Sequence, residues 1–297
     1  MAEPTLWVAV DGGGSGTRLR ARASTGAFIE LEGGPSALSR GASSAWGVIE
    51  PLIHRAGAAL GVSIDWSTTA LAIGLAGLNQ PEWHRVFKSA LPVCHTLVLE
   101  SDVTTALVGA HQRRAGVLLA LGTGSIGAAV NAAREVSLVG GFGFPVGDEA
   151  SGAWLGLHAS RHLQKAFDGR CVPDAFSEAL AQALKVTDIE ALVARLSAMD
   201  ANAFARLAPI VLVHSTHPKA RELLNWAGRE MAEMIEALDP EGRLPLALSG
   251  GLGGPLSEWL PERYRARLVD AQGDALDGAL ALLHDPTLLT PIHKGLS

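Results

Sequence analysis

The chain of 297 residues has few cysteines, few aromatic side chains and no long apolar run. Its two cysteines, Cys94 and Cys171, are far apart and lack the paired spacing of a zinc site. We therefore expect no disulfide framework, which is typical of a protein from a reducing cytoplasm. The longest apolar stretches cover about ten residues and are interrupted by glycine, so we expect no membrane-spanning segment.

Positive charge is also scarce. The chain carries 24 basic and 30 acidic residues, a net charge of −6, and its longest basic run is Arg113-Arg114. We therefore expect no nucleic-acid partner, because such proteins usually present a basic patch. The opening MAEPTLWVAV lacks the positive segment and long apolar run of a secretory signal, so we expect a cytoplasmic protein.

Glycine, in contrast, is abundant and gathers in three clusters. These clusters occur in DGGGSGT from Asp11, in GTGSIG from Gly122 and in GGLGG from Gly250, each after an apolar run typical of a buried strand. Glycine lets the backbone approach a ligand closely, and successive N–H groups in such turns bind anions such as phosphate. Three clusters at strand ends favour phosphate binding over three unrelated tight turns.

Strand-like and helix-like segments alternate along the first part of the chain. We expect strands on both sides of the first glycine cluster, near Phe28, at Thr69–Gly77 and at His95–Asp102, and helices at Ser43–Leu60, from Pro81 and from Thr104. The strand–turn–strand pattern of Trp7–Ala23 recurs at Gly116–Val130. This order predicts an α/β fold with two domains, residues 1–113 and 114–297, and a largely helical stretch over residues 150–237.

Two named phosphate-binding motifs are built on glycine-rich turns, the P-loop and the dinucleotide-binding fingerprint. No lysine follows any cluster, so the P-loop pattern is absent. Gly122 to Gly127 match G-x-G-x-x-G, but a dinucleotide site requires a helix to begin at that turn. Residues 128–139 contain Asn131 and an Arg134-Glu135 turn, which predict a hairpin instead. A dinucleotide-dependent oxidoreductase is therefore disfavoured.

Asp11 lies where the first expected strand meets its glycine turn. A carboxylate beside bound phosphate is repelled unless a cation lies between them, and Mg²⁺ held by carboxylates and phosphates is the usual solution. A turn-forming aspartate fits the DGG pattern equally well.

Several motifs together resemble the N-acetylglucosamine kinase and glucosamine kinase family of the actin-like ATPase superfamily. They are DGGGSGTR, LAIGLAGLNQPEW, LESD, ALGTGSIG, GGFGFPVGDEASGAWLG, LSGGLGG and DALDGALALL, and they cover nearly the whole chain. The most specific motif lies at residues 140–156. The resemblance implies two related ribonuclease-H-like α/β domains flanking a cleft for ATP and sugar, with the last helix packing back on the first domain.

The resemblance also implies the roles of particular residues. The nucleotide-binding set comprises Gly12, Gly13, Gly14, Ser15, Thr17, Gly122, Thr123, Gly124 and Ser125 at the phosphates, and Gly250 and Gly251 at the adenosine. Asp11 is the implied Mg²⁺ ligand, and Asp102 the implied catalytic base and sugar ligand. Asp148 and Gly152 are also implied at the sugar. A different interpretation of Asp102 is that its side chain caps the helix that follows.

One loop departs from the family pattern. Many relatives place a sugar-binding asparagine in the loop that here reads EGGPSALSRG, from Glu32 to Gly41, which has none. Ser36 or Ser39 is the expected substitute.

The activity that the resemblance implies is ATP- and Mg²⁺-dependent phosphorylation of the 6-hydroxyl of N-acetylglucosamine or glucosamine by a homodimer. One alternative is a regulatory ATPase resembling the activators of 2-hydroxyacyl-CoA dehydratases, although Cys94 and Cys171 do not match the expected cluster ligands. Another is a non-catalytic sugar-binding regulator, which would bind sugar without forming ADP.

Overall fold

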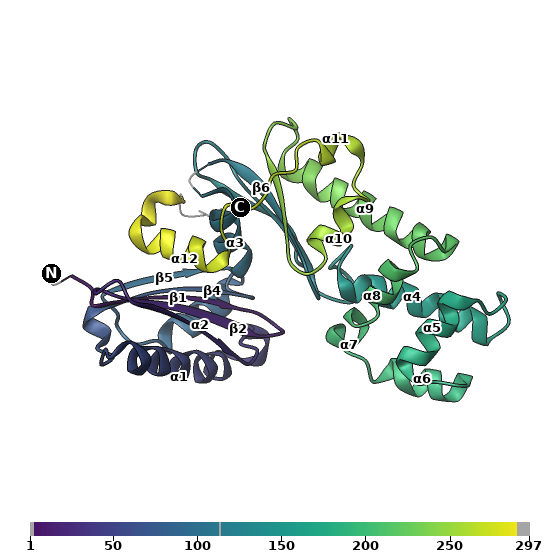
Figure 1. The fold of residues 1–297 in the computed structure, drawn as a ribbon, viewed down its shortest axis with the longest axis horizontal. Coiled ribbons are helices and arrows are strands. Elements are labelled where there is room, and N and C mark those ends of the chain that lie inside the picture. The colour runs from purple at the N-terminus through teal and green to yellow at the C-terminus, as the bar shows by residue number, and fades with distance from the viewer. Residues whose placement is uncertain (1–2, 113, 290–297) are drawn as a thin grey trace. The chain divides into compact units, whose positions relative to one another are not determined.

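The computed structural model describes residues 3–112 and 114–289, and it divides into two compact units (Figure 1). Unit 1 comprises Met1–Leu118, Ala128–Ser137 and Asp270–Ser297, and unit 2 comprises Leu119–Gly127 and Leu138–Val269. The chain thus crosses between the units several times. The single boundary expected at residue 113 lies near the end of the first stretch of unit 1, and residue 113 itself is outside the described residues.

The strands of the described residues form two sheets. They are β1 (Leu6–Gly12), β2 (Thr17–Ala23), β3 (Phe28–Gly33), β4 (Thr69–Leu75), β5 (Thr96–Glu100), β6 (Gly116–Leu121), β7 (Ser125–Val130), β8 (Val136–Gly140) and β9 (Leu246–Ser249). The first sheet has the order β3-β2-β1-β4-β5, and the second has the order β8-β7-β6-β9. In the first sheet β1 is antiparallel to β2 and parallel to β4, and β4 is parallel to β5.

The α-helices of unit 1 follow or cover its sheet, and the remaining helices belong to unit 2. Those of unit 1 are α1 (Ala42–Leu60), α2 (Pro81–Ser89), α3 (Asp102–His111) and α12 (Ala275–His284). Those of unit 2 are α4 (Gly152–Phe167), α5 (Ala175–Leu184), α6 (Ile189–Ser197), α7 (Ala201–Ala205), α8 (Ala208–Val213), α9 (Pro218–Leu238), α10 (Gly253–Ser257) and α11 (Glu262–Arg265). Short 3₁₀ helices lie at Leu38–Arg40, Trp66–Thr68 and Pro286–Leu288.

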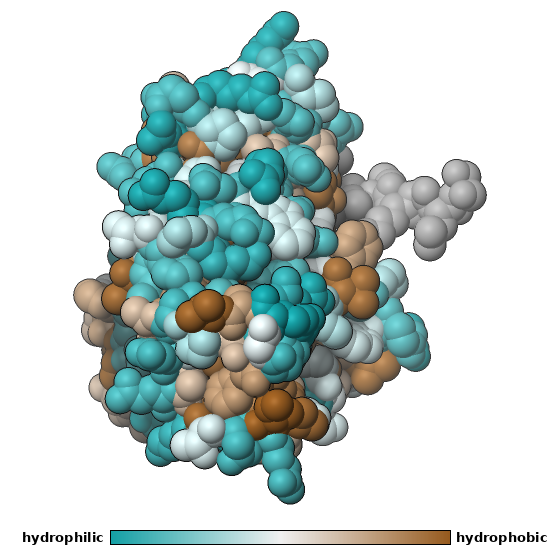
Figure 2. Space-filling model, turned by 90° about the vertical axis from the view of Figure 1, so that its right-hand side faces the viewer, coloured by the Kyte–Doolittle hydropathy of each residue, from teal (hydrophilic) through white to brown (hydrophobic). Residues whose placement is uncertain are grey.

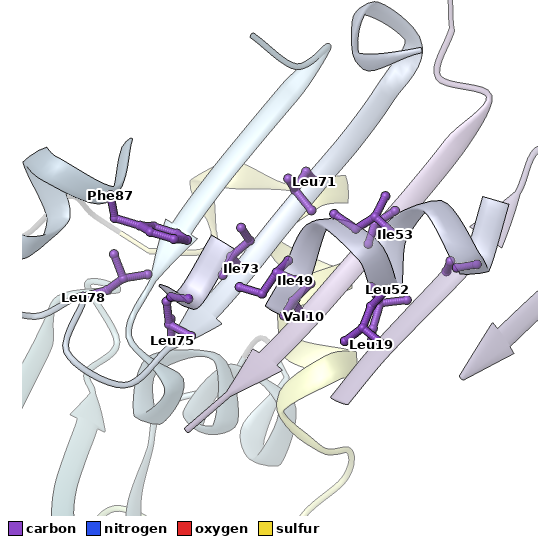
Figure 3. Packing of buried hydrophobic residues seen from close by; sticks show 14 of the residues in the cluster. Val10, Leu19, Ile49, Leu52, Ile53, Leu71, Ile73, Leu75, Leu78 and Phe87 are labelled. Carbon is purple, nitrogen blue, oxygen red and sulfur yellow. The ribbon is translucent and has the colours of Figure 1, made fainter. Parts of the chain in front are cut away.

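One face of the first sheet packs against α1 (Figure 3). Alternate residues of β1 point to this face, and Val10 meets Ile49 and Ile53 there without exposure to solvent. The expected helix at residues 43–60 is present, but Gly41 occupies its N-cap position, while the expected caps Ser43 and Ser44 lie in its first turn.

The opposite face of the sheet packs against α12, with α3 alongside (Figure 1). The sheet offers small side chains, Ala9, Ala70 and Ala72, to the apolar side of α12. Glycines at the crossing of α3 and α12 let the two backbones approach closely, because a Cβ on Gly278 would lie 1.9 Å from the carbonyl oxygen of Thr105. The last helix therefore belongs to the core of unit 1.

The observed strands agree in type with the expected ones, although some end at a different residue. β4 is buried along its whole length, as its continuous apolar sequence predicts. β5 ends at Glu100 rather than at Asp102, and Asp102 is instead the first residue of α3. The G-x-G-x-x-G stretch leads into strand β7 and the hairpin to β8, which removes the helix that a dinucleotide site requires. Residues 150–237 contain helices and no strand.

In the described part of the chain, no helix combines the length and apolarity needed to cross a membrane. The face shown in Figure 2 is mainly hydrophilic, and its apolar residues form separate small patches. This face therefore shows no single large apolar surface.

Candidate active site

The first glycine turn joins β1 to β2 and is held in place by hydrogen bonds from the loop that contains Ser36. The N–H of Gly13 donates to the carbonyl oxygen of Gly16 at 2.9 Å, and the carbonyl oxygen of Gly13 accepts the N–H groups of Ser36 and Ala37 at 3.1 and 3.2 Å. Gly14 and Ser15 are exposed at the tip. The turn is thus a fixed and accessible stretch of backbone, as phosphate binding requires.

Ser36 lies directly behind this turn. It has no exposed surface, and its hydroxyl is 2.6 Å from the hydroxyl of Thr17, which in turn donates to the carbonyl oxygen of Gly34. A Cβ on Gly12 would lie 2.2 Å from the Ser36 hydroxyl oxygen. Ser36 and Thr17 therefore support the turn in this structure, while Ser39 is exposed.

Asp11 is fixed by an arginine on the neighbouring strand. Asp11 and Arg18 are direct partners in the β1–β2 register, and Arg18 donates from Nε and Nη2 to Oδ2 of Asp11 at 3.2 and 2.8 Å. The same guanidinium donates from Nη1 to Oδ2 of Asp274 at 2.9 Å. Both hydrogen bonds from Arg18 to the Asp11 carboxylate are accepted by Oδ2, and the side chain of Asp11 is 23% exposed. The carboxylate is thus oriented and partly accessible.

Asp102 begins α3 at the carboxyl end of the sheet, where open α/β sheets bind ligands. Burial raises the pKa of its carboxyl to about 6, and the nearby charge of Asp11 adds to the rise. Its Oδ1 accepts the N–H of Val103 at 2.9 Å. The N-cap of α3 is Ser101, whose side chain accepts the N–H of Thr104. The N-cap of α3 is therefore Ser101 and not Asp102.

Glu100 is a candidate site residue that sequence reasoning missed. In the sheet register it pairs with Gly74, which pairs with Asp11, so Glu100 and Asp11 lie on the same face at the ends of their strands. Burial raises the pKa of Glu100 to about 7. The signal was present in LESD, where Glu100 stands two positions before Asp102, but only the strand register shows that it shares a face with Asp11.

The second glycine turn, Gly122–Ser125, joins β6 to β7 in unit 2 and is anchored to the start of α4. Gly152 and Ala153 donate their N–H groups to the carbonyl oxygens of Gly122 and Thr123 at 2.8 and 3.1 Å. The hydroxyl of Ser125 donates to the carbonyl oxygen of Glu149 at 2.6 Å. Gly152 therefore positions the turn through its backbone, and the hydroxyl proton of Ser125 is already used.

Thr123 has a partner that the sequence did not reveal. Its hydroxyl donates to Oδ1 of Asn202 at 3.3 Å, from helix α7. The two residues are 79 positions apart, so no local pattern connects them. Asn202 thereby orients a side chain that the resemblance places at the phosphates.

Asp148 lies against the second turn. A Cβ on Gly124 would be 2.7 Å from Oδ2 of Asp148. Burial raises the pKa of Asp148, while hydrogen bonds from the backbone N–H groups of Ser125, Gly143 and Phe144 oppose the rise. The carboxylate therefore joins the second turn to the Gly140–Gly147 loop. The backbone of Asp148 is in the left-handed region, with a φ of 62°.

The third glycine cluster packs on the end of β6. Gly250 has a φ of 80°, and a Cβ there would lie 2.3 Å from the carbonyl oxygen of Leu121. Leu252 donates its N–H to the same oxygen at 3.0 Å. Gly251 is exposed and has open space where a Cβ would lie. Unit 2 therefore brings the second and third clusters to one strand end.

Each unit thus presents a set of groups with a distinct chemistry. Unit 1 combines an exposed glycine turn with the carboxylates of Asp11, Glu100 and Asp102. Unit 2 combines two glycine turns with the N-terminus of α4, whose first N–H groups hold the second turn. Unit 1 can therefore bind a cation and phosphate and accept a hydroxyl proton, and unit 2 can bind phosphate.

Comparisons with known proteins agree with this chemistry. No family model matches the chain. Glucosamine kinase GspK of Vibrio cholerae is 28% identical over 285 residues, covering 94% of this chain and 96% of the relative. The N-acetylmuramic acid/N-acetylglucosamine kinase of Clostridium acetobutylicum is 26% identical over 300 residues, covering 93% and 97%.

A solved structure is more similar still. The crystal structure of a Chromobacterium violaceum protein, described provisionally as an N-acetylglucosamine kinase, is 41% identical. It superposes with a TM-score of 0.89 and covers 94% of this chain and 99% of its own. This similarity confirms the expected pair of α/β domains with the actin-like ATPase fold. The chain is therefore a phosphotransferase and belongs to the N-acetylglucosamine and glucosamine kinase family.

Proposed function

We propose that this amino-sugar kinase transfers the γ-phosphoryl group of ATP to the 6-hydroxyl of glucosamine or N-acetylglucosamine. The observation that carries the proposal is the Asp102 carboxylate, half-buried at the carboxyl end of the sheet with a pKa of about 6. A base whose pKa lies near the working pH is largely ionised there and still accepts a proton readily.

Asp102 accepts the proton of the attacking hydroxyl. The sugar oxygen forms a bond to the γ-phosphorus, the bond from that phosphorus to the bridging oxygen breaks, and ADP leaves with the bond electrons. Such transfers depend mainly on positioning and on stabilisation of charge at the phosphoryl oxygens. The N–H of Val103 at Oδ1 orients the Asp102 carboxylate for this step and favours its ionised form, which burial disfavours.

The glycine turns supply backbone N–H groups to the phosphates. We assign Gly12, Gly13, Gly14 and Ser15, with Thr17 behind them, and Gly122, Thr123, Gly124 and Ser125 to the phosphate chain, and Gly250 and Gly251 to the adenosine. Asn202 and Asp148 hold the second turn in place. For the sugar we assign Asp102 and Asp148, with Gly152 setting the position of the turn through its N–H.

Asp11 fits a magnesium ion. Mg²⁺ is commonly held through one or two carboxylates together with substrate phosphates, and it neutralises charge that develops on the phosphoryl oxygens. Arg18 occupies Oδ2 of Asp11 and fixes the plane of the carboxylate, so the ion would be held through Oδ1.

The test is a coupled ADP-release assay with glucosamine, N-acetylglucosamine, N-acetylmuramic acid, N-acetylmannosamine and glucose. We expect an amino sugar to give the highest kcat/KM, and phosphorus NMR of its product to show coupling to the protons on carbon 6. The 6-deoxy analogue of the best substrate should bind without turnover. Nucleotide binding without ADP formation for any sugar would refute the assignment and favour the sugar-binding regulator.

Two further expectations accompany this proposal. We propose a homodimer in the cytoplasm, which analytical ultracentrifugation and cell fractionation would test. The regulatory ATPase remains the competing class, and an iron–sulfur absorbance in anaerobically purified protein would favour it.

A further inference from the structure

Three side chains from separate segments of unit 2 converge away from the glycine turns. His162 lies on α4, Asp174 immediately precedes α5, and His217 immediately precedes α9. Nε2 of His162 and Nε2 of His217 lie 3.0 and 3.2 Å from the same oxygen, Oδ2 of Asp174. The three atoms lie within 4.8 Å of one another, and no other trio of such ligands is brought together within residues 3–112 and 114–289.

The packing around these groups fixes their orientation. The ring of His162 stacks on Phe176 with centroids 5.5 Å apart, and the ring of His217 lies 5.4 Å from the same phenyl ring. Oδ1 of Asp174 accepts the N–H of Ser177 at 2.8 Å, which leaves Oδ2 for the two imidazoles. The side chain of His162 is only 9% exposed. A ligand set with these orientations loses little further conformational entropy on binding an ion.

We propose that His162, Asp174 and His217 bind one divalent transition-metal ion, for which zinc is the best match. Two imidazoles and one carboxylate form a ligand set suited to zinc, whereas magnesium and calcium prefer oxygen ligands. Three protein ligands leave a fourth position for water. The site is independent of the proposed kinase chemistry, because none of its residues belongs to the glycine turns or to the carboxylates of unit 1.

The competing explanation is a hydrogen-bonded cluster without metal. In that state each imidazole donates its Nε2–H to Asp174, and Nδ1 of His217 accepts the N–H of Lys219 at 3.2 Å. Binding of a metal to Nε2 moves the proton of a neutral ring to Nδ1, so the long bond from Lys219 is lost. The bond from Ser177 to Asp174 is unaffected. The ion therefore replaces two N–H···O contacts and one weak helix cap with three coordinate bonds.

The site connects helices that the second glycine turn depends on. Gly152 at the start of α4 donates its N–H to that turn, and His162 lies on the same helix. An ion at the cluster would tie α4 to the N-termini of α5 and α9. We therefore expect zinc to raise the melting temperature of the full-length protein.

The test is calorimetric titration of Zn²⁺ into full-length protein stripped of metal with a chelator, with Co²⁺ absorption as a second readout. We expect one ion per chain and a cobalt spectrum of nitrogen and oxygen ligands without thiolate absorption. Asp174→Asn retains a good helix cap but loses the anionic ligand, so its fold is retained and its affinity should fall by about tenfold or more. His162→Gln should weaken binding in the same way.

Two matched controls separate this site from adventitious binding. His214→Gln removes a histidine that also packs on Phe176, at 5.6 Å, but that lies outside the trio. Cys171→Ser removes the thiol nearest in sequence to Asp174. Both variants should bind zinc as the wild type does. The proposal is overturned if the wild type shows no saturable zinc binding, or if Asp174→Asn binds as tightly as the wild type.

Discussion

Asp102→Asn should stabilise the protein while it abolishes most of the activity. Burial raises the pKa of Asp102 from its usual 3.8 to about 6, which means that the folded protein disfavours the charged form. A difference of about 2 pKa units corresponds to about 3 kcal/mol, an upper bound for a partly accessible group. Asparagine is uncharged, and its Oδ1 can still accept the N–H of Val103. The variant should therefore be more stable at pH 8 by up to about 3 kcal/mol.

The pH dependence gives the sign of this effect. A carboxyl whose pKa is raised by folding destabilises the folded state above the raised value, about pH 6 here, and has no such effect once it is protonated in both states. The gain in Asp102→Asn should thus be largest at pH 8 and be lost below about pH 3, where the carboxyl is protonated in both states. Urea unfolding at several pH values would measure it. Ser101→Ala is the matched comparison, because loss of the true N-cap should lower stability by about 0.5–2 kcal/mol.

The kinetic part of the same prediction uses the coupled ADP assay. Loss of the general base should lower kcat by about 10²–10⁴-fold, with little change in ATP binding. An Asp102→Asn protein with kcat within a few-fold of wild type would refute the catalytic assignment. A variant that is less stable than wild type at pH 8 would refute the argument from desolvation, whatever its activity.

Three further predictions concern other parts of the two units. Gly124→Val places its Cβ about 2.7 Å from the carboxylate of Asp148, which we assign to the sugar, so it should raise the KM for ATP and the KM for sugar together; an unchanged KM for ATP would refute the assignment of this turn to the phosphates. Glu100→Gln should stabilise the protein at pH 8.5, by at most about 3 kcal/mol for a pKa raised from 4.5 to about 7, with no gain below pH 4 in urea unfolding. Gly278→Ala should cost about 1–3 kcal/mol in the same assay because its Cβ meets the backbone of α3, whereas Gly47→Ala, with open space in α1, should be neutral or stabilising.

The glycine turns and their strands could be predicted from sequence because their signals are local. An apolar run followed by clustered glycines marks a strand end, and Asn131 with the Arg134-Glu135 turn predicted the β7–β8 hairpin. The buried strand β4 was equally clear from its continuous apolar sequence. These features depend on neighbours within about ten residues, the range over which periodicity is informative.

The supporting contacts could not be predicted, because they join distant segments. Arg18 bridges Asp11 to Asp274, which lies 256 positions after Arg18, and the local pattern that marks Asp11 does not connect these three residues. The sequence showed a serine at position 36 in the sugar loop, but not that its hydroxyl faces inward to Thr17. The hydrogen bonds from the N–H groups of Ser125, Gly143 and Phe144 to Asp148 likewise form only once the Gly140–Gly147 loop has folded back.

The return of α12 to unit 1 has a consequence for synthesis of the chain. Ala275 follows His111, the last residue of α3, by 164 positions. At a translation rate of about 5–20 residues per second, the ribosome needs roughly 10–30 s to supply the helix that covers Ala9, Ala70 and Ala72. During that interval the nascent sheet presents an uncovered apolar face, the kind of surface that chaperones bind. Truncation before residue 275 would make this transient state permanent.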